Sequence, residues 1–177
     1  MTYQSTSAQS RGSLKAIDLR AEYLENPIGI DITKPRLSWI VTSLERAQNQ
    51  SAYQIVIASN PTALEKSADL WDTGKVISSE TNHIIYAGKQ LKSRMQIYWK
   101  VRSWDNNDIV SEWSDVATWS MGLLSFSDWE ASWIGYDIPE EELDEDKELE
   151  LAPSPYLRTE FDTKPDTKIK RATIYAS

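Results

Sequence analysis

The 177-residue chain is long enough for one domain and part of another, and its 40% hydrophobic and 26% charged residues are typical of a globular protein. It has no cysteine and one histidine, which excludes disulfides, a thiol nucleophile, cysteine-ligated zinc and a histidine-rich metal site. The net charge of −8 comes from one segment, because residues 1–123 have 13 basic and 13 acidic side chains whereas residues 124–152 have 1 basic and 11 acidic. A neutral body with an acidic segment argues against nucleic acid as a partner.

The start of the chain and its hydropathy leave the compartment open. Residues 1–13 are polar and lack the apolar stretch of a signal peptide, so we predict a disordered polar tail. No apolar run approaches the ~20 residues that a membrane helix needs, and we expect no membrane partner. The protein is either cytoplasmic, or periplasmic or extracellular with its signal removed.

Short strands separated by turn residues follow this tail. We predict seven of them, over residues 14–19, 35–41, 52–59, 71–77, 82–87, 95–105 and 116–123. Asn60 is expected to cap a short helix that begins at Pro61. Turn signals that recur about every 8–15 residues are typical of an all-β sandwich, so we predict an antiparallel sandwich over residues 14–123.

Alternation of apolar and polar residues within the strands predicts which side chains form the core. Trp39 and Trp99 lie on the apolar faces of two central strands, so we expect both indoles to be buried. Strict alternation from residue 14 puts Leu19 on the outer face of the first strand. The isolated Gly74 predicts a bulge within the strand 71–77.

The character of the chain changes after residue 123. Residues 124–152 are predicted to be a tryptophan-containing linker, because the nearly continuous acidic run Glu140–Glu150 is unable to bury itself. Strand patterning returns in residues 153–177, which we interpret as the truncated first strands of a second β-sandwich domain. Two indoles and an isoleucine near the start of the linker would form an exposed apolar patch, so we predict that they dock another domain: Trp129, Trp133 and Ile134.

The sequence offers no convincing reaction centre. The glycines are isolated from one another, so phosphate-binding loops and a nucleophile elbow are not supported. Glycosidases use two carboxyl groups, but the run Glu140–Glu150 lacks the rigid, desolvated frame that a catalytic acid needs. His83 is a lone imidazole and is interpreted as structural. We therefore predict no catalytic, cofactor-binding or metal-binding residue, and no cofactor.

One strand carries cations and indoles on the same face. In the strand 95–105, Lys100, Arg102 and Trp104 share the face opposite Trp99, and Trp113 follows shortly afterwards. These four side chains are predicted to interleave as a cation–π ladder worth ~0.5–2 kcal/mol per contact. The ladder is interpreted as structural, and a platform for stacking sugar rings is the alternative.

Several motifs resemble the N-terminal region of the bacterial α-L-rhamnosidases of glycoside hydrolase family 78. They are LRAEYLENPIGID at residues 19–31, KPRLSW at 34–39, AYQI at 52–55, LWDTGKV at 70–76, YAG at 86–88, LKSR at 91–94, YWKVR at 98–102, WS at 113–114, MGLL at 121–124, DW at 128–129 and WIG at 133–135. The resemblance extends over nearly all of residues 14–136.

The resemblance implies an immunoglobulin-like, fibronectin type III β-sandwich that precedes a second, carbohydrate-binding sandwich and a catalytic (α/α)₆ barrel. The two carboxylates of that family's inverting mechanism have no matching position here, so no catalytic residue is carried over. The implied role is a non-catalytic N-terminal module of an enzyme that hydrolyses terminal α-L-rhamnosyl residues. Its implied partners are the later domains of the same parent chain.

Other interpretations remain open beside this one. A carbohydrate-binding module would use surface tryptophans for weak contact with rhamnose-containing glycans. A complete small glycosidase would hydrolyse an aryl rhamnoside, and a receptor-like protein-binding domain is suggested only by the tetrapeptide SEWS. The chain also departs from the sandwich pattern, because Ile97 stands where a tyrosine usually ties the corner with its hydroxyl, with Tyr98 beside it.

Overall fold

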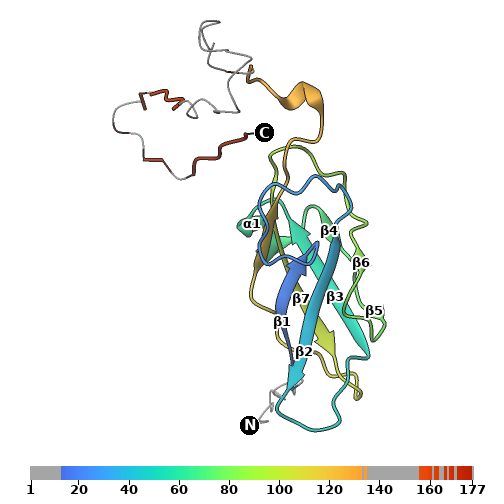
Figure 1. The fold of residues 1–177 in the computed structure, drawn as a ribbon. Coiled ribbons are helices and arrows are strands. Elements are labelled where there is room, and N and C mark those ends of the chain that lie inside the picture. The colour runs from blue at the N-terminus through green and yellow to red at the C-terminus, as the bar shows by residue number, and fades with distance from the viewer. Residues whose placement is uncertain are drawn as a thin grey trace, which may run out of the picture. The chain divides into compact units, whose positions relative to one another are not determined.

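Two antiparallel sheets face each other in the first part of the molecule (Figure 1). The computed structural model describes residues 13–132, 134, 156–160, 162–163, 166, 168–169 and 171–176. The chain divides into a first unit, Met1–Glu130, and a second, Ala131–Ser177. None of the described residues after Asp128 belongs to a helix or strand, so the truncated second sandwich stays a prediction.

The sheets have three and five strands. The first sheet, in the order β1-β2-β6, consists of β1 (Leu14–Ala21), β2 (Arg36–Ser43) and β6 (Ile84–Ile85). The second, in the order β4-β3-β7-β8 with β5 also paired to β3, consists of β3 (Ala52–Ala58), β4 (Trp71–Asp72), β5 (Val76–Ile77), β7 (Gln96–Trp104) and β8 (Ala117–Ser120). The short helices are α1 (Pro61–Lys66) and the 3₁₀ helix η1 (Phe126–Asp128).

The predicted fold class is confirmed, and so is the helix start. The described residues of the first unit form an all-β, immunoglobulin-like sandwich. Asn60 caps α1, because its side-chain oxygen accepts a hydrogen bond from the Ala63 amide at 2.8 Å. The first unit continues to Glu130, beyond the predicted end of the sandwich at residue 123.

Three details of the strand prediction are wrong, and the first two have a local cause. Asp18 adopts a left-handed φ of 51° at a bulge in β1, which reverses the alternation and buries Leu19. The predicted strand 71–77 is two short strands, because the Thr73 hydroxyl accepts the hydrogen bond of the Ile55 amide and the backbone turns at Gly74, φ 59°. The strand expected over 82–87 is only Ile84–Ile85.

Aromatic rings from both sheets form the core. Trp99 and Trp119 are fully buried, and their rings meet edge to face with centroids 6.3 Å apart. Trp39 is 3% exposed, so the predicted burial of Trp39 and Trp99 is confirmed. Ile97, which stands where a tyrosine is usual, is fully buried, and the buried Tyr86 donates from its hydroxyl to the Lys89 carbonyl at 2.6 Å.

The loop after β1 covers the outer edge of β8. The Ser120 amide donates to the Pro27 carbonyl at 3.0 Å, and the Ile30 amide donates to the Ser120 carbonyl at 2.9 Å. Gly122 is required beside this loop, since a Cβ there would lie 2.9 Å from the Gly29 carbonyl oxygen. The motif ENPIGID therefore protects an exposed edge strand from pairing with another chain.

Candidate functional site

The four residues of the predicted ladder lie together on the outer face of the five-stranded sheet. The Arg102 guanidinium is 4.5 Å from the centroid of the Trp113 ring and 5.2 Å from that of Trp104. The Lys100 ammonium is 5.2 Å from the Trp113 centroid. A fifth residue, Lys75, which the sequence analysis missed, lies 5.0 Å from the Trp104 centroid.

Hydrogen bonds hold the central cation of the ladder in place. The Arg102 guanidinium donates twice to the side-chain oxygen Oε1 of Gln54, at 2.9 and 2.7 Å, because β3 and β7 pair these two residues directly. The Gln54 amide nitrogen then donates to Asp72 at 2.7 Å. The outer cations have acidic neighbours, since Lys75 pairs with Asp108 and Lys100 lies 3.7 Å from the Glu65 carboxylate. Two of the three cations therefore have acidic partners within the chain, and Arg102 is held by a neutral amide.

This arrangement is better suited to stiffening the sheet than to stacking a sugar. Trp104 and Trp113 each have two cations within 5.2 Å of their ring centroids. A cation over an indole occupies the electron-rich face that a sugar ring would need. The Lys100 side chain is only 12% exposed, so its contact with Trp113 is largely shielded from water.

Replacing Arg102 with alanine is expected to lower the free energy of unfolding by about 1–2 kcal/mol, because two cation–π contacts and the bonds to Gln54 disappear. The matching fall in melting temperature is about 5 °C for a domain of this size. The control is Arg46→Ala in an exposed loop, which should melt like the parent chain. An unchanged melt of Arg102→Ala would refute the ladder as a stabilising device.

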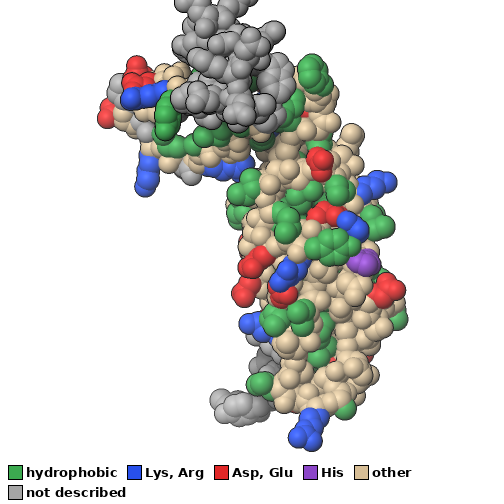
Figure 2. All heavy atoms as spheres, in the orientation of Figure 1, with side chains coloured by type: hydrophobic (Ala, Val, Ile, Leu, Met, Phe, Trp, Pro, Cys, Tyr) green, Lys and Arg blue, Asp and Glu red, His purple; other side chains and the backbone are tan. Residues whose placement is uncertain are grey.

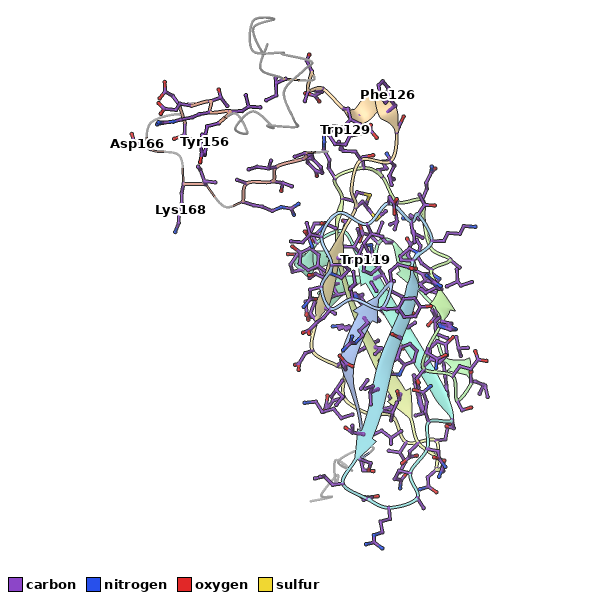
Figure 3. All side chains as sticks on the ribbon, in the orientation of Figure 1. Trp119, Phe126, Trp129, Tyr156, Asp166 and Lys168 are labelled. Atoms are coloured by element: carbon purple, nitrogen blue, oxygen red, sulfur yellow. The ribbon has the colours of Figure 1, made fainter. Side chains whose placement is uncertain are left out.

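The three predicted docking residues differ in their exposure and in whether the structure describes them. Trp129 is 37% exposed and follows η1, where Figure 3 shows it close to the more exposed Phe126 and away from the core residue Trp119. Trp133 lies outside the described residues. Ile134, in the second unit, is 73% exposed.

The segment that leads out of the sandwich is tied back to it. The Asp128 carboxylate accepts hydrogen bonds from the Ser93 hydroxyl at 2.5 Å and from the Ser125 amide at 2.9 Å. These bonds, with the nearby Arg94, lower the pKa of Asp128. The Arg94 guanidinium also donates to the Asp128 carbonyl at 2.8 Å and pairs with Glu130 at 3.3 Å. The direction in which the chain leaves the first unit is therefore fixed as far as Glu130.

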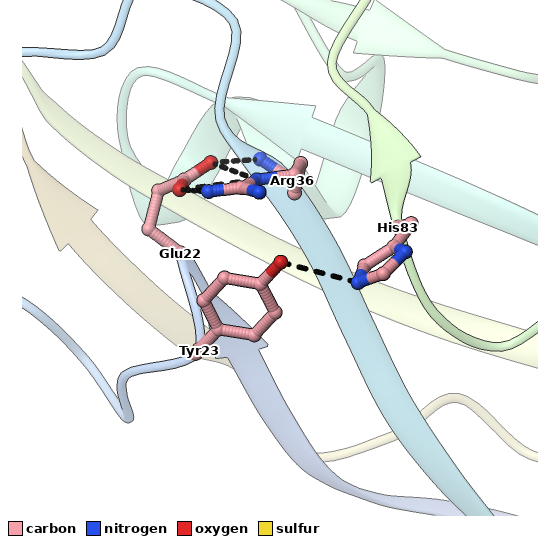
Figure 4. Close-up of polar contacts among 4 residues, drawn as sticks. All are labelled: Glu22, Tyr23, Arg36 and His83. Atoms are coloured by element: carbon pink, nitrogen blue, oxygen red, sulfur yellow. Dashed lines mark hydrogen bonds and ion pairs between the residues drawn. The ribbon is translucent and has the colours of Figure 1, made fainter.

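A second polar cluster joins the loop after β1 to β2 and β6 (Figure 4). The Glu22 carboxylate accepts hydrogen bonds from the Arg36 amide at 2.6 Å and from its guanidinium at 2.5 Å. That guanidinium lies 4.7 Å from the centroid of the Tyr23 ring, and the Tyr23 hydroxyl is 3.1 Å from Nε2 of His83. The sequence predicted a structural role for His83 but gave no signal for its partner, because Tyr23 is 60 residues away.

Acid should weaken this cluster. The hydrogen bonds and charge of Arg36 hold the pKa of Glu22 below its usual value of 4.5. A lowered folded-state pKa stabilises the fold fully above about pH 4.5, and this contribution is lost as the pH falls through the folded-state pKa. Urea unfolding at pH 7 and at pH 3 should show that Glu22→Gln is more destabilising at the higher pH. An equal effect at both pH values would contradict the depressed pKa.

The described residues contain no group of three or more histidine, cysteine, aspartate or glutamate side chains placed to hold a metal ion. Asp69 resembles Glu22 and Asp128: burial opposes its ionisation, but the hydrogen bonds from Ser59 outweigh burial and lower its pKa. Over the same part of the chain, no helix is both long and apolar enough to cross a membrane.

The fold and these surfaces define an immunoglobulin-like domain. The sequence model of the family "Rha78A-like, N-terminal immunoglobulin domain" matches residues 16–125. The chain belongs to this family. The α-L-rhamnosidase of Alteromonas sp. (strain LOR) is 41% identical over 153 residues, which are 86% of this chain and 16% of that protein. An α-L-rhamnosidase of Formosa agariphila is 40% identical over 88% of this chain and 17% of its own length. The chain thus spans about a sixth of these relatives.

Solved structures agree with the sequence relatives. The α-L-rhamnosidase of Streptomyces avermitilis, solved with L-rhamnose, matches with a TM-score of 0.68 and 40% identity over 71% of this chain and 12% of that one. The α-L-rhamnosidase of Aspergillus terreus matches with a TM-score of 0.56 and 25% identity over 66% of this chain and 13% of its own. The predicted resemblance to the N-terminal region of family 78 rhamnosidases is therefore confirmed.

Proposed function

We propose that this chain is a non-catalytic N-terminal domain of a larger α-L-rhamnosidase, and that it packs against later domains of the same polypeptide. The observation that carries the proposal is the match of residues 16–125 to the N-terminal immunoglobulin domain of such enzymes, while the chain spans only 16% and 17% of two of them. The parent enzyme would hydrolyse terminal α-L-rhamnosyl residues.

The chemistry of three carboxyl groups supports a non-catalytic role. A glycosidase needs a general acid whose pKa is raised, so that it still holds a proton at neutral pH. Glu22, Asp69 and Asp128 instead have lowered pKa values, and each accepts hydrogen bonds from an arginine or a serine. These groups are built to stay ionised and to fasten loops rather than to donate a proton.

The tethered exit supports packing against a following domain. Ser93 and Arg94 fix the chain through Asp128, so the polypeptide leaves the sandwich in a defined direction. Fixing the chain as far as Glu130 shortens the free part of the predicted linker ahead of residue 153, which lowers the entropy lost when a following domain docks. The exposed Phe126 and Trp129 at this exit offer apolar area for the contact.

Incubation of the purified chain with an aryl α-L-rhamnoside tests the non-catalytic assignment. We expect no turnover above the uncatalysed rate, and turnover that scales with the concentration of the chain would contradict the proposal. The carbohydrate-binding alternative is tested by titrating a rhamnose-containing oligosaccharide while following tryptophan fluorescence. A saturable change at millimolar sugar would favour that alternative.

A further inference from the structure

The outer face of the three-stranded sheet exposes large apolar side chains on a rigid support. Ile17 and Ile40 are partners in the β1–β2 register, and they are 37% and 50% exposed. Further along, Ile85 of β6 is 58% exposed and stands opposite Arg36 of β2. These three side chains share the outer face of the sheet, with Ser38 and Arg36 of β2 between Ile40 and Ile85, and we call this surface the isoleucine face. Side-chain alternation alone would favour polar residues here.

The polar cluster of Figure 4 lies at one end of the isoleucine face. Tyr23 is 49% exposed, and its ring and hydroxyl are held by Arg36 and His83. Glu22, Tyr23 and His83 all have left-handed backbones, with φ of 49°, 65° and 55°. Strained non-glycine residues persist where the surroundings fix them, and they gather at sites with a function. Tyrosine and arginine are also enriched among the hot spots of protein interfaces.

Apart from Ile77 of β5, which is 80% exposed, the outer face of the opposite sheet is largely covered by the chain itself. Its indoles, Trp104 and Trp113, are engaged by the cations of the ladder, and α1 buries Leu64 against Val56. The two faces therefore differ in how much of their apolar side chains the chain itself covers. Figure 2 shows exposed hydrophobic side chains near the histidine and several charged groups on the face turned toward the viewer.

We propose that the isoleucine face is the surface on which the rest of the parent enzyme packs, an inference that rests on the proposed function. The length of chain outside this one supplies the occupant, since residues matched here are only 16% of the Alteromonas relative. The occupant presents an apolar surface. At the margin of the face, Arg20 forms an ion pair with Asp18 and Arg36 forms one with Glu22. The occupant therefore needs no acidic residues to pair with these two arginines.

Single-cysteine labelling tests this assignment, because the chain has no cysteine of its own. Ile40→Cys reports on the isoleucine face, and Val116→Cys is the matched control, since Val116 is 47% exposed and precedes β8 of the other sheet. Maleimide labelling is followed by mass spectrometry in this chain alone and in the parent polypeptide that contains it. We expect similar rates for both positions in the chain alone, and a roughly tenfold or greater slowing at Ile40→Cys in the parent polypeptide.

Each outcome separates this inference from the proposed function. Slowing at Val116→Cys with none at Ile40→Cys would overturn the isoleucine face while domain packing stands. No slowing at either position would overturn the isoleucine face and leave the exit residues Phe126 and Trp129 as the remaining contact for domain packing. Slowing of Ile40→Cys in the chain alone, with a concentration-dependent dimer in sedimentation, would show that a second copy covers the face and would overturn the inference. Thr42→Cys, exposed on the same strand, replaces Ile40→Cys if that variant fails to fold.

Discussion

Trp99→Ala should lower the free energy of unfolding by about 3–5 kcal/mol, which is a large part of the ~5–15 kcal/mol that a domain of this kind has. Trp99 is fully buried in β7, between β3 and β8, and its ring packs on Trp119. Alanine leaves a cavity in the centre of the sandwich that neighbouring strands are too regular to fill. Urea unfolding followed by circular dichroism measures the loss.

Two variants sharpen the Trp99 experiment. Trp129→Ala removes a partly exposed indole from the exit segment, and its effect should stay below about 1 kcal/mol. Trp99→Phe should cost much less than Trp99→Ala, because the buried indole Nε1 has no hydrogen-bond partner among the described atoms and the ring is mostly retained. Equal losses for Trp99→Ala and Trp129→Ala would contradict the placement of Trp99 at the centre of the core.

Gln50→Leu should destabilise the domain by about 3 kcal/mol or more, since it leaves several buried polar groups without a partner at ~1–3 kcal/mol each. The side-chain oxygen Oε1 of Gln50 accepts hydrogen bonds from the Trp39 indole of the first sheet at 3.1 Å and from the Ser103 hydroxyl of the second at 2.7 Å. Its amide nitrogen donates to the carbonyls of Ser78 and Glu80, at 3.2 and 2.8 Å. One side chain thereby joins both sheets and the loop between β5 and β6.

Gln54→Leu is the matched control for Gln50→Leu. Gln54 also makes hydrogen bonds, but its partners Arg102 and Asp72 lie on the outer face, where water can replace them. Its loss should be about 1 kcal/mol or less. If chemical denaturation gave the two leucine variants the same stability, the buried network would not be what joins the sheets.

The sequence predicted those features that depend on local alternation. The burial of Trp39 and Trp99 and the shared face of Lys100, Arg102 and Trp104 follow from the two-residue period of a strand. The bulge at Asp18 was missed because one inserted residue leaves no mark in the composition, yet it reverses the face of Leu19.

The sequence pattern did not predict the contacts between segments that are distant in the chain. Gln54 meets Arg102 only because β3 and β7 pair in one register, and a shift by one residue would separate them. Lys75 reaches Trp104 from beside the left-handed Gly74, whereas Tyr23 meets His83 where both residues are left-handed and neither is a glycine. A non-glycine residue in that conformation is fixed by tertiary contacts, so local propensity does not reveal it.

Removal of residues 14–130 from the proposed parent enzyme measures most directly whether this domain supports an enzyme without taking part in its chemistry. The shortened enzyme should hydrolyse an aryl α-L-rhamnoside with a kcat within about twofold of the intact one. Its melting temperature should fall by about 5 °C or more, because the surface that packed on the domain becomes exposed. A kcat that collapses at an unchanged melting temperature would place these residues in the reaction, and no change in either quantity would remove the packing role.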